Sequence, residues 1–411
     1  MKQELLKQYA RFAVEVGVNP QSCQTLIINA PVEAADFART CAEVAYEAGA
    51  KQVVVYYNDE KLSRIQMERT QVEVLEDVKP TIYRRYLDYF ESQGGACILH
   101  IIASDPDIYA GIDPEKIARA SKARSIATEP YREYVMKDKV QWTIVAIPSE
   151  AWAKKVFPQE TAHAQEKLWQ AIFDVCRVQE GGDVVALWKE HIAQMIHRRY
   201  FINSLDIDTL HLTSANGTDL TIGLADHALW KGATSVTPEG YTFIANIPTE
   251  EVFTAPHKDR VDGIVYGTKP YVYNGTVIEN FWVRFEKGKV VEHHAEKNEE
   301  VLGKLLNTDE GARHIGEIAL VPASSPINKS GLLFFNTLFD ENAACHIAFG
   351  AGYPGTVKGG ESLSEAELQA LGVNKSLVHE DVMIGAEDMT IIATSKSGKE
   401  TLIFEKGEWA F

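Results

Sequence analysis

The spacing of apolar residues changes near residue 205, and this change constrains the fold more than any other feature of the sequence. Before it, four β-branched, apolar runs alternate with longer amphipathic segments, of which 32–48 is one. The runs cover 25–29, 52–57, 97–103 and 142–147. Short apolar runs separated by helical periodicity are typical of βαβ units. They predict a mostly parallel sheet covered by helices.

Helical spacing continues from residue 151 to 204, with Leu168, Ile172 and Val175 and then Trp188 and Met195 recurring on one face. We interpret Trp188 and Met195 as packing residues, because large apolar side chains at helical spacing normally face a core.

After residue 206 the pattern becomes alternating strands joined by tight turns. The pairs Asn216-Gly217, Asn274-Gly275 and Lys287-Gly288 each separate two apolar runs, which is a hairpin signal. One short helix is expected within 359–374, with Ser364 as its cap. The sequence thus predicts two domains. Residues 1–205 are expected to form an α/β domain with a mostly parallel sheet, and residues 206–411 a strand-rich α+β domain.

Charge and composition narrow the classes of partner. A chain of 411 residues with 45% hydrophobic residues can bury a sizeable core, and a net charge of -17 argues against nucleic acid and against an anionic membrane surface. The charged, amphipathic start is unlike a signal peptide, and no apolar run reaches the ~18 residues that a spanning helix needs. The five widely spaced cysteines suit buried thiols in a reducing compartment. We expect a cytoplasmic protein.

Chemistry-bearing residues crowd the second half. His379 and Asp381 stand two apart before an apolar run, so in an extended backbone both side chains leave the same face and can meet one ion. Alone, a His-x-Asp pair is more typical of a surface turn. His346 has apolar neighbours and Glu341 lies five residues upstream. A core histidine with its hydrogen bonds satisfied is the ordinary interpretation. However, a carboxylate and an imidazole on either side of a buried run are costly unless they have polar partners.

Three more carboxylates compete for a role. Glu317 leads into an apolar strand, where it is either a partner of Arg313 or a metal ligand. Glu250 and Glu251 stand on a probable strand, so only one of them can point inward.

Two further motifs are weaker. The His293-His294 pair ends a hairpin strand among charged neighbours and reads as a solvated face. The spacing of Gly350, Gly352 and Gly355 matches a dinucleotide-binding pattern, but Tyr353-Pro354 fills it and no helix is expected to follow. We interpret it as a turn-rich loop that presents Tyr353. Cys345 beside His346 is predicted to be a buried thiol rather than a nucleophile.

Taken together, the candidate ligands are four carboxylates and two histidines, which are Glu251, Glu317, Glu341, His346, His379 and Asp381. One ion does not need six such ligands. Two divalent ions about 3.5 to 4 Å apart, bridged by a carboxylate, would use all six. The absence of cysteine from this set argues against a structural zinc site.

The order of these motifs resembles the M29 family of metallo-aminopeptidases, which includes aminopeptidase T, aminopeptidase S and PepS. The stretches that carry the resemblance are PTEEVFTAPH, RHIGEIA, ENAACHIAFGAGYP and His-x-Asp followed by MIG. The resemblance implies removal of N-terminal residues from peptides with divalent cobalt, zinc or magnesium, and a homodimer. It assigns metal binding to the same six residues, with Glu317 able to bridge the ions, and places Tyr353 near them. Val382 stands where we expected an aromatic residue.

These observations lead to a hypothesis of two divalent ions that activate a water molecule, with Tyr353 stabilising the oxyanion and Glu317 carrying a proton to the leaving amine. A two-metal phosphoesterase is an alternative, although it would need cationic groups to hold phosphate, and Arg313 is nearly alone in the motifs. A non-enzymatic, metal-stabilised binding protein is a second alternative.

Overall fold

The protein consists of two compact units in the computed structural model, which describes residues 3–103, 105, 107–273 and 276–411. Unit 1 comprises Met1–His191 and Thr234–Pro248, and unit 2 comprises Ile192–Ala233 and Thr249–Phe411. Helix α10 (Val184–Ser204) belongs to both, and the predicted division at residue 205 falls just after its end. Among the described residues, no helix is long and apolar enough to cross a membrane.

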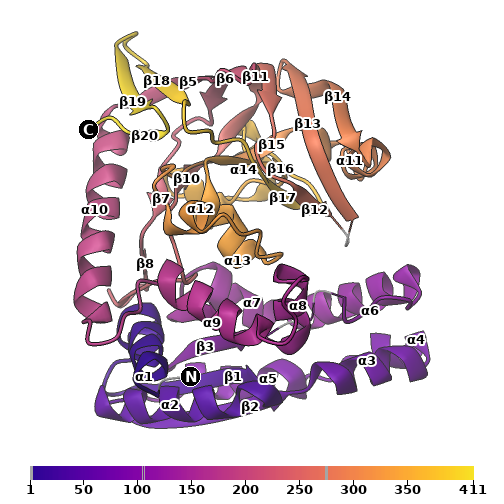
Figure 1. The fold of residues 1–411 in the computed structure, drawn as a ribbon, viewed down its shortest axis with the longest axis vertical. Helices are drawn as coiled ribbons and strands as arrows, with labels where there is room; N and C mark the ends of the chain where they lie inside the picture. The colour runs from indigo at the N-terminus through magenta and orange to yellow at the C-terminus, as the bar shows by residue number, and fades with distance from the viewer. Residues whose placement is uncertain (1–2, 104, 106, 274–275) are drawn as a thin grey trace. The chain divides into compact units, whose positions relative to one another are not determined.

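Unit 1 is built on a parallel sheet, as predicted. Its strands are β1 (Thr25–Pro31), β2 (Gln52–Asn58), β3 (Ala96–Ile102) and β4 (Trp142–Ala146), in the order β2-β1-β3-β4. Every neighbouring pair is parallel. Strands β1, β2 and β3 lie among the helices of unit 1 in Figure 1. The described bounds differ from the predicted runs by no more than two residues at either end. The centre of β1 and β3 is buried on both faces, which explains their continuous apolar runs.

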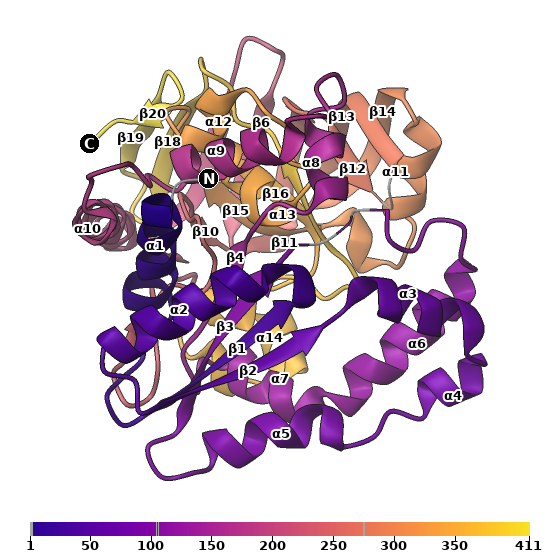
Figure 2. The same cartoon turned by 60° about the horizontal axis from the view of Figure 1, so that its bottom comes forward.

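Helical segments precede, separate and follow the strands of unit 1 among the described residues, besides the first part of α10. They are α1 (Gln3–Arg11), the π-helix η1 (Phe12–Val18), η2 (Val32–Ala34), α2 (Ala35–Glu47), α3 (Glu60–Arg69), α4 (Val72–Glu76), α5 (Thr81–Phe90), α6 (Pro114–Ala127), α7 (Glu129–Met136), α8 (Glu150–Val156) and α9 (Ala164–Val175). Helix α4 packs against α6, and α5 packs against α7 (Figure 2). The short strands β8 (Ser235–Val236) and β9 (Thr242–Phe243) pair with each other.

Unit 2 is rich in antiparallel strands, as predicted, and the described residues form two sheets. The larger sheet has the order β12-β13-β11-β6-β5-β18-β19-β20, with β14 on β13. Its strands are β5 (Ile207–Thr213), β6 (Asp219–Leu224), β11 (Pro256–Tyr266), β12 (Tyr271–Tyr273), β13 (Thr276–Glu286), β14 (Lys289–Lys297), β18 (Thr390–Ser395), β19 (Glu400–Glu405) and β20 (Glu408–Trp409).

The smaller sheet of unit 2 has the order β17-β16-β15-β10-β7. Its strands are β7 (Lys231–Gly232), β10 (Val252–Thr254), β15 (Ile315–Leu320), β16 (His346–Gly350) and β17 (His379–Met383). The helical segments of this unit, besides part of α10, are α11 (Glu299–Leu305), η3 (Gly311–Arg313), α12 (Pro326–Ser330), α13 (Thr337–Asp340), η4 (Glu341–Ala343), η5 (Pro354–Thr356), η6 (Gly360–Ser362) and α14 (Glu365–Ala370).

Local turn and cap signals match the structure of unit 2. Asn216-Gly217 joins β5 to β6, and Lys287-Gly288 joins β13 to β14. The predicted Asn274-Gly275 turn lies outside the described residues. Helix α14 begins after Ser364, whose side chain forms a capping box with Glu367, so the predicted cap is confirmed.

The packing of both units agrees with most of the sequence-based expectations. Trp188 and Met195 are fully buried, which confirms their role in packing. Four of the five cysteines are buried, whereas Cys23 is exposed. The expectation of a buried thiol was wrong for Cys23, because it lies in the turn before β1 rather than within a strand.

Candidate metal centre

The smaller sheet of unit 2 brings two of the candidate carboxylates to one face. In antiparallel strands, residues directly opposite each other project to the same face. Ala348 on β16 is opposite Glu317 on β15 and opposite Asp381 on β17. Glu317 and Asp381 therefore point the same way, and only the small methyl group of Ala348 stands between them.

A bulge in β15 sets this register. The pairing with β16 shifts between Ile315 and Glu317, and without the shift Glu317 would be opposite Ile347 and face the other side. Gly316 occupies the bulge. A β-carbon at this position would lie 2.2 Å from the Ala351 carbonyl oxygen, so only glycine fits.

The two histidines and a third carboxylate reach the same face. His346 stands two residues before Ala348 on β16, and His379 stands two residues before Asp381 on β17. Glu251 lies just before β10, two residues before Phe253. Phe253 is opposite Ala319 on β15, and Ala319 is in turn opposite His346 on β16. Residues from four neighbouring strands or their ends thus converge.

The donor atoms form two groups that share Glu317. His346 Nε2 lies 3.3 Å from Glu251 Oε2 and 3.5 Å from Glu317 Oε1. His379 Nε2 lies 3.5 Å from Asp381 Oδ1 and 4.0 Å from Glu317 Oε2. Within each group all donor atoms lie within 4.8 Å of one another. The two oxygens of Glu317 therefore face different groups, as a bridging carboxylate does.

Backbone carbonyls orient both imidazole rings. His346 Nδ1 lies 3.2 Å from the Ala344 oxygen, and His379 Nδ1 lies 2.7 Å from the Ala351 oxygen. A carbonyl oxygen only accepts hydrogen bonds, so each Nδ1 carries a proton and donates it. The Nε2 atoms are then left to face the carboxylates, which is the arrangement found for histidine ligands of metals.

The electrostatics of the cluster require positive charge. Burial, together with the charges of Glu251 and Asp381 and against the effect of His346, raises the pKa of Glu317 to about 7. Burial lowers the pKa of each imidazole, but the carboxylates more than offset this. They raise the pKa of His346 well above its ordinary value and that of His379 to about 9. Protons thus balance the carboxylates when no other cation does.

Two acceptors remain unmatched within the described chain. Glu317 Oε2 and Asp381 Oδ1 are buried and receive no hydrogen bond from any described residue. A buried carboxylate oxygen without a partner is costly, and carboxylate and imidazole donors together suit divalent metal ions. The residues present therefore fit a metal centre, and a bound cation would satisfy both oxygens.

Glu341 and Tyr353 border the two groups without belonging to either. Glu341 lies on η4, and burial followed by the charges of Glu251 and Asp381 raises its pKa well above the ordinary value. The ring centroid of Tyr353 lies 4.7 Å from that of His379. Burial and then the charge of Glu317 raise the pKa of Tyr353, so its hydroxyl stays protonated and can donate.

The structure decides between the alternatives left open for Arg313 and Cys345. Arg313 donates to the Val290 carbonyl and to Asn307 Oδ1, so it is not the partner of Glu317. Cys345 donates to the Val321 carbonyl, and burial raises its pKa to about 11, which agrees with an inert thiol.

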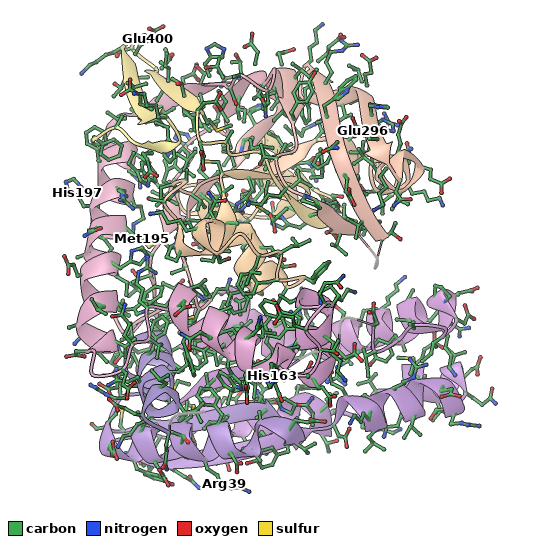
Figure 3. All side chains as sticks on the ribbon, viewed as in Figure 1. Arg39, His163, Met195, His197, Glu296 and Glu400 are labelled. Atoms are coloured by element: carbon green, nitrogen blue, oxygen red, sulfur yellow. The ribbon has the colours of Figure 1, made fainter. Side chains whose placement is uncertain are left out.

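Neither of the two weaker motifs supplies a donor atom to the two groups of described residues. His294 on β14 pairs with Glu299, with about half of each side chain exposed. Glu296 on the same strand points outward, which confirms a solvated face (Figure 3). The loop after Gly350 contains only the single turn η5, so the glycine pattern opens no long helix.

Sequence reasoning missed several supporting residues. Glu250, next to Glu251, is only 3% exposed, and its backbone N–H donates to Asn342 Oδ1 at 2.7 Å. Gly316 was also missed, although an isolated glycine in an apolar strand is a known signal of a bulge or a close backbone approach. No local signal marked Ala348.

A buried cluster of carboxylates and oriented imidazoles on neighbouring strands is typical of a metal-dependent protein with an acidic centre. The profile of the thermophilic metalloprotease (M29) family matches residues 2–409. Aminopeptidase 2 of Geobacillus stearothermophilus is 44% identical over 99% of this chain and 98% of its own length, and aminopeptidase AmpS of Bacillus subtilis (strain 168) is 43% identical over the same shares. The chain belongs to the M29 metalloprotease family.

A solved structure supports the same assignment. Wild-type AmpT from Thermus thermophilus matches with a TM-score of 0.90, 41% identity and 99% coverage of both chains. The α/β and strand-rich architecture predicted from the sequence is therefore shared with this relative.

Proposed function

We propose that this metallo-aminopeptidase releases N-terminal residues from peptides with water activated between two divalent ions. The single observation that carries the proposal is the pair of donor groups that share Glu317. Glu251, Glu317 and His346 would hold one ion, and Glu317, His379 and Asp381 the other. When bound, such ions lower the pKa of a coordinated water toward ~7 and polarise the substrate carbonyl. Cobalt, zinc and magnesium remain candidates, since imidazole suits zinc and cobalt while carboxylates suit magnesium.

The chain's own residues would supply orientation and proton transfer. The protonated hydroxyl of Tyr353 would donate to the oxygen of the attacked carbonyl as negative charge develops there. Glu317 is the first candidate to carry a proton to the leaving amine. Glu341 is the second, because it lies beside the centre outside both donor groups. The surplus of carboxylates would attract the free ammonium group of a peptide, which favours cleavage at the N-terminus.

The chemistry of the centre disfavours a phosphoesterase. Within the described residues, the ion-pair partners of Glu251, Glu317 and Asp381 are histidines alone, and Arg313 is bound elsewhere. A phosphate group would meet negative charge there without a lysine or arginine to hold it.

A homodimer is the assembly that we propose. Helices α3, α4 and α6 expose large apolar side chains, each more than half exposed: Leu62, Ile65, Val74 and Ile126. Large apolar side chains that are exposed on several helices favour burial against another chain. Analytical ultracentrifugation of the full chain tests this, and a monomer at micromolar concentration would contradict it.

Metal removal is the first test of the proposed function. We expect chelation to abolish hydrolysis of leucyl and arginyl chromogenic amides and added Co²⁺, Zn²⁺ or Mg²⁺ to restore it, while a phosphoester stays uncleaved throughout. Full peptidase activity in metal-free protein would contradict the proposal.

Substitution distinguishes the roles of Glu317 and Glu341 in proton transfer. We expect Glu317→Gln to weaken binding of both ions and to abolish turnover. Glu341→Gln should keep both ions if Glu317 carries the proton, with a small loss of rate. A Glu317→Gln enzyme with two ions and a near-normal rate would refute the role of Glu317, and a Glu341→Gln enzyme with both ions but no turnover would assign proton transfer to Glu341.

A further inference from the structure

We infer that Tyr271 is a positioning residue for the metal centre, acting through Glu380 on the strand that carries His379 and Asp381. This inference rests on the proposed function, since it concerns the group formed by Glu317, His379 and Asp381. It goes beyond that function by assigning a role to two residues that contribute no donor atom to either group.

Strand β17 needs support because it is an edge strand. It ends the order β17-β16-β15-β10-β7, so its backbone pairs with β16 on one side only. The strands that carry the other group are different, since β15 and β16 each have a neighbour on both sides. An edge strand with unpaired N–H and C=O groups can tilt or fray more easily than an inner strand.

Glu380 is the residue through which β17 is held. It stands between His379 and Asp381, so its side chain leaves the opposite face of the strand. The Tyr271 hydroxyl donates to Glu380 Oε2 at 2.5 Å, a length typical of a hydrogen bond to a charged oxygen. A bond on the back face resists rotation of the strand about its own axis, and such rotation would move both ligands at once.

Tyr271 is itself anchored. It lies on β12, where it pairs with Ile278 on β13, and it packs against the main hydrophobic core of unit 2. A second tether lies farther along β17, where the Thr268 N–H donates to the Met383 carbonyl at 2.9 Å. Of these two tethers, the Tyr271–Glu380 bond is therefore the one nearer to the ligands, and it ties β17 to the larger sheet.

Loss of this bond should affect one ion more than the other. Groups that hold metal ligands in place typically contribute about 10- to 100-fold to metal affinity. In Tyr271→Phe, β17 loses its restraint and His379 and Asp381 lose their alignment, whereas Glu251 and His346 keep theirs. We expect one dissociation constant to rise by about 10- to 100-fold and the other to change little.

The chain offers a matched control on the same strand. Tyr273 stacks on Tyr271 with ring centroids 6.3 Å apart, and in the described part of the chain its hydroxyl makes no hydrogen bond. Tyr273→Phe removes the same atom at nearly the same place without touching Glu380. The experiment titrates metal-free wild type, Tyr271→Phe and Tyr273→Phe with Zn²⁺ against a chelating dye, and records Co²⁺ spectra and melting temperatures.

Selective weakening of one ion in Tyr271→Phe, with wild-type affinities in Tyr273→Phe, would support the inference. Unchanged affinities in Tyr271→Phe, or equal weakening of both ions in the two variants, would overturn it. If Tyr271→Phe does not fold, Glu380 is changed instead. Glu380→Gln still accepts the hydrogen bond and should bind as wild type, whereas Glu380→Ala should reproduce the selective loss.

The wild-type stoichiometry separates this inference from the proposed function. A wild-type chain that binds a single ion contradicts the two-ion function. The role of Tyr271 is then tested with that single ion. The inference holds if Tyr271→Phe binds the ion more weakly than Tyr273→Phe does, and it fails if the two variants bind the ion with equal affinity.

Discussion

Unit 1 holds a half-buried histidine and unit 2 a buried one among polar neighbours, but only the first has all of its polar neighbours satisfied. In unit 1, His100 Nδ1 lies 3.3 Å from Asn29 Nδ2, and His100 Nε2 lies 3.1 Å from the Tyr131 hydroxyl. The Tyr86 hydroxyl donates to Asn29 Oδ1 at 2.8 Å. Every ring nitrogen has a partner, and burial lowers the pKa of His100 to about 4, so the ring is neutral.

The cluster of unit 2 is incomplete by comparison. His346 and His379 face three carboxylates, and Glu317 Oε2 and Asp381 Oδ1 lack a hydrogen bond from any described residue. A polar network that closes on itself stabilises its fold, whereas one with surplus negative charge needs a cation from outside. The comparison teaches that burial of histidine alone does not mark a functional site, and that unmatched acceptors do.

Removal of one histidine from each unit should give the largest difference. We expect His346→Ala to weaken ion binding by at least about 100-fold and to reduce turnover to a similar or greater extent. His100→Ala should retain ion stoichiometry and turnover but lose about 1 to 3 kcal/mol of stability, because Asn29 and Tyr131 lose a partner. Metal titration, peptidase assay and urea unfolding of both variants measure this. Loss of metal binding in His100→Ala would contradict the comparison of the two clusters.

The pH dependence of stability should have opposite signs in the two clusters. The folded pKa of His100 is about 4, below the unfolded value of 6.5. Its contribution is intact above pH 6.5 and falls by about 3 kcal/mol as pH drops toward 4. In metal-free protein the pKa of Glu317 is about 7 and that of His379 about 9, both raised, so the folded state holds extra protons. The stability that these bound protons contribute is present at low pH and is lost as pH rises through 7 and 9.

Urea unfolding of metal-free protein between pH 5 and 9 measures both slopes. His100→Gln should reduce the loss of stability at acid pH and leave the loss at alkaline pH unchanged. Saturating metal should remove the loss on the alkaline side, since ions replace the protons, and metal affinity should increase with pH. A metal-free protein that gains stability from pH 7 to 9 would contradict the assignment of surplus negative charge.

A change remote from both clusters should give the smallest effect. Ser364→Ala removes the cap of α14, where the Ser364 N–H also donates to Glu367 Oε2 at 2.8 Å. We expect a loss of about 1 kcal/mol with unchanged metal affinity and peptidase rate. A change in metal affinity would mean that the centre depends on the packing of unit 2 as a whole rather than on its own ligands.

Local signals in the sequence predicted much of the fold. The strands of unit 1, the turns at Asn216-Gly217 and Lys287-Gly288 and the cap at Ser364 follow from periodicity and residue type over a few positions. Such signals involve neighbours in the chain, so one sequence is enough to see them. The packing of residues 234–248 with unit 1 has no such signal.

For this protein the sequence by itself determined the classes of its elements and the short list of carboxylates and histidines, because both depend on residue type and local spacing. Only the tertiary structure decided which atoms meet. The bulge at Gly316 turns Glu317 toward Asp381, Arg313 bonds elsewhere, and Tyr271 reaches Glu380 across more than a hundred residues. Strand register joins distant segments, and a shift of one residue reverses every side chain, so no local pattern can specify these contacts.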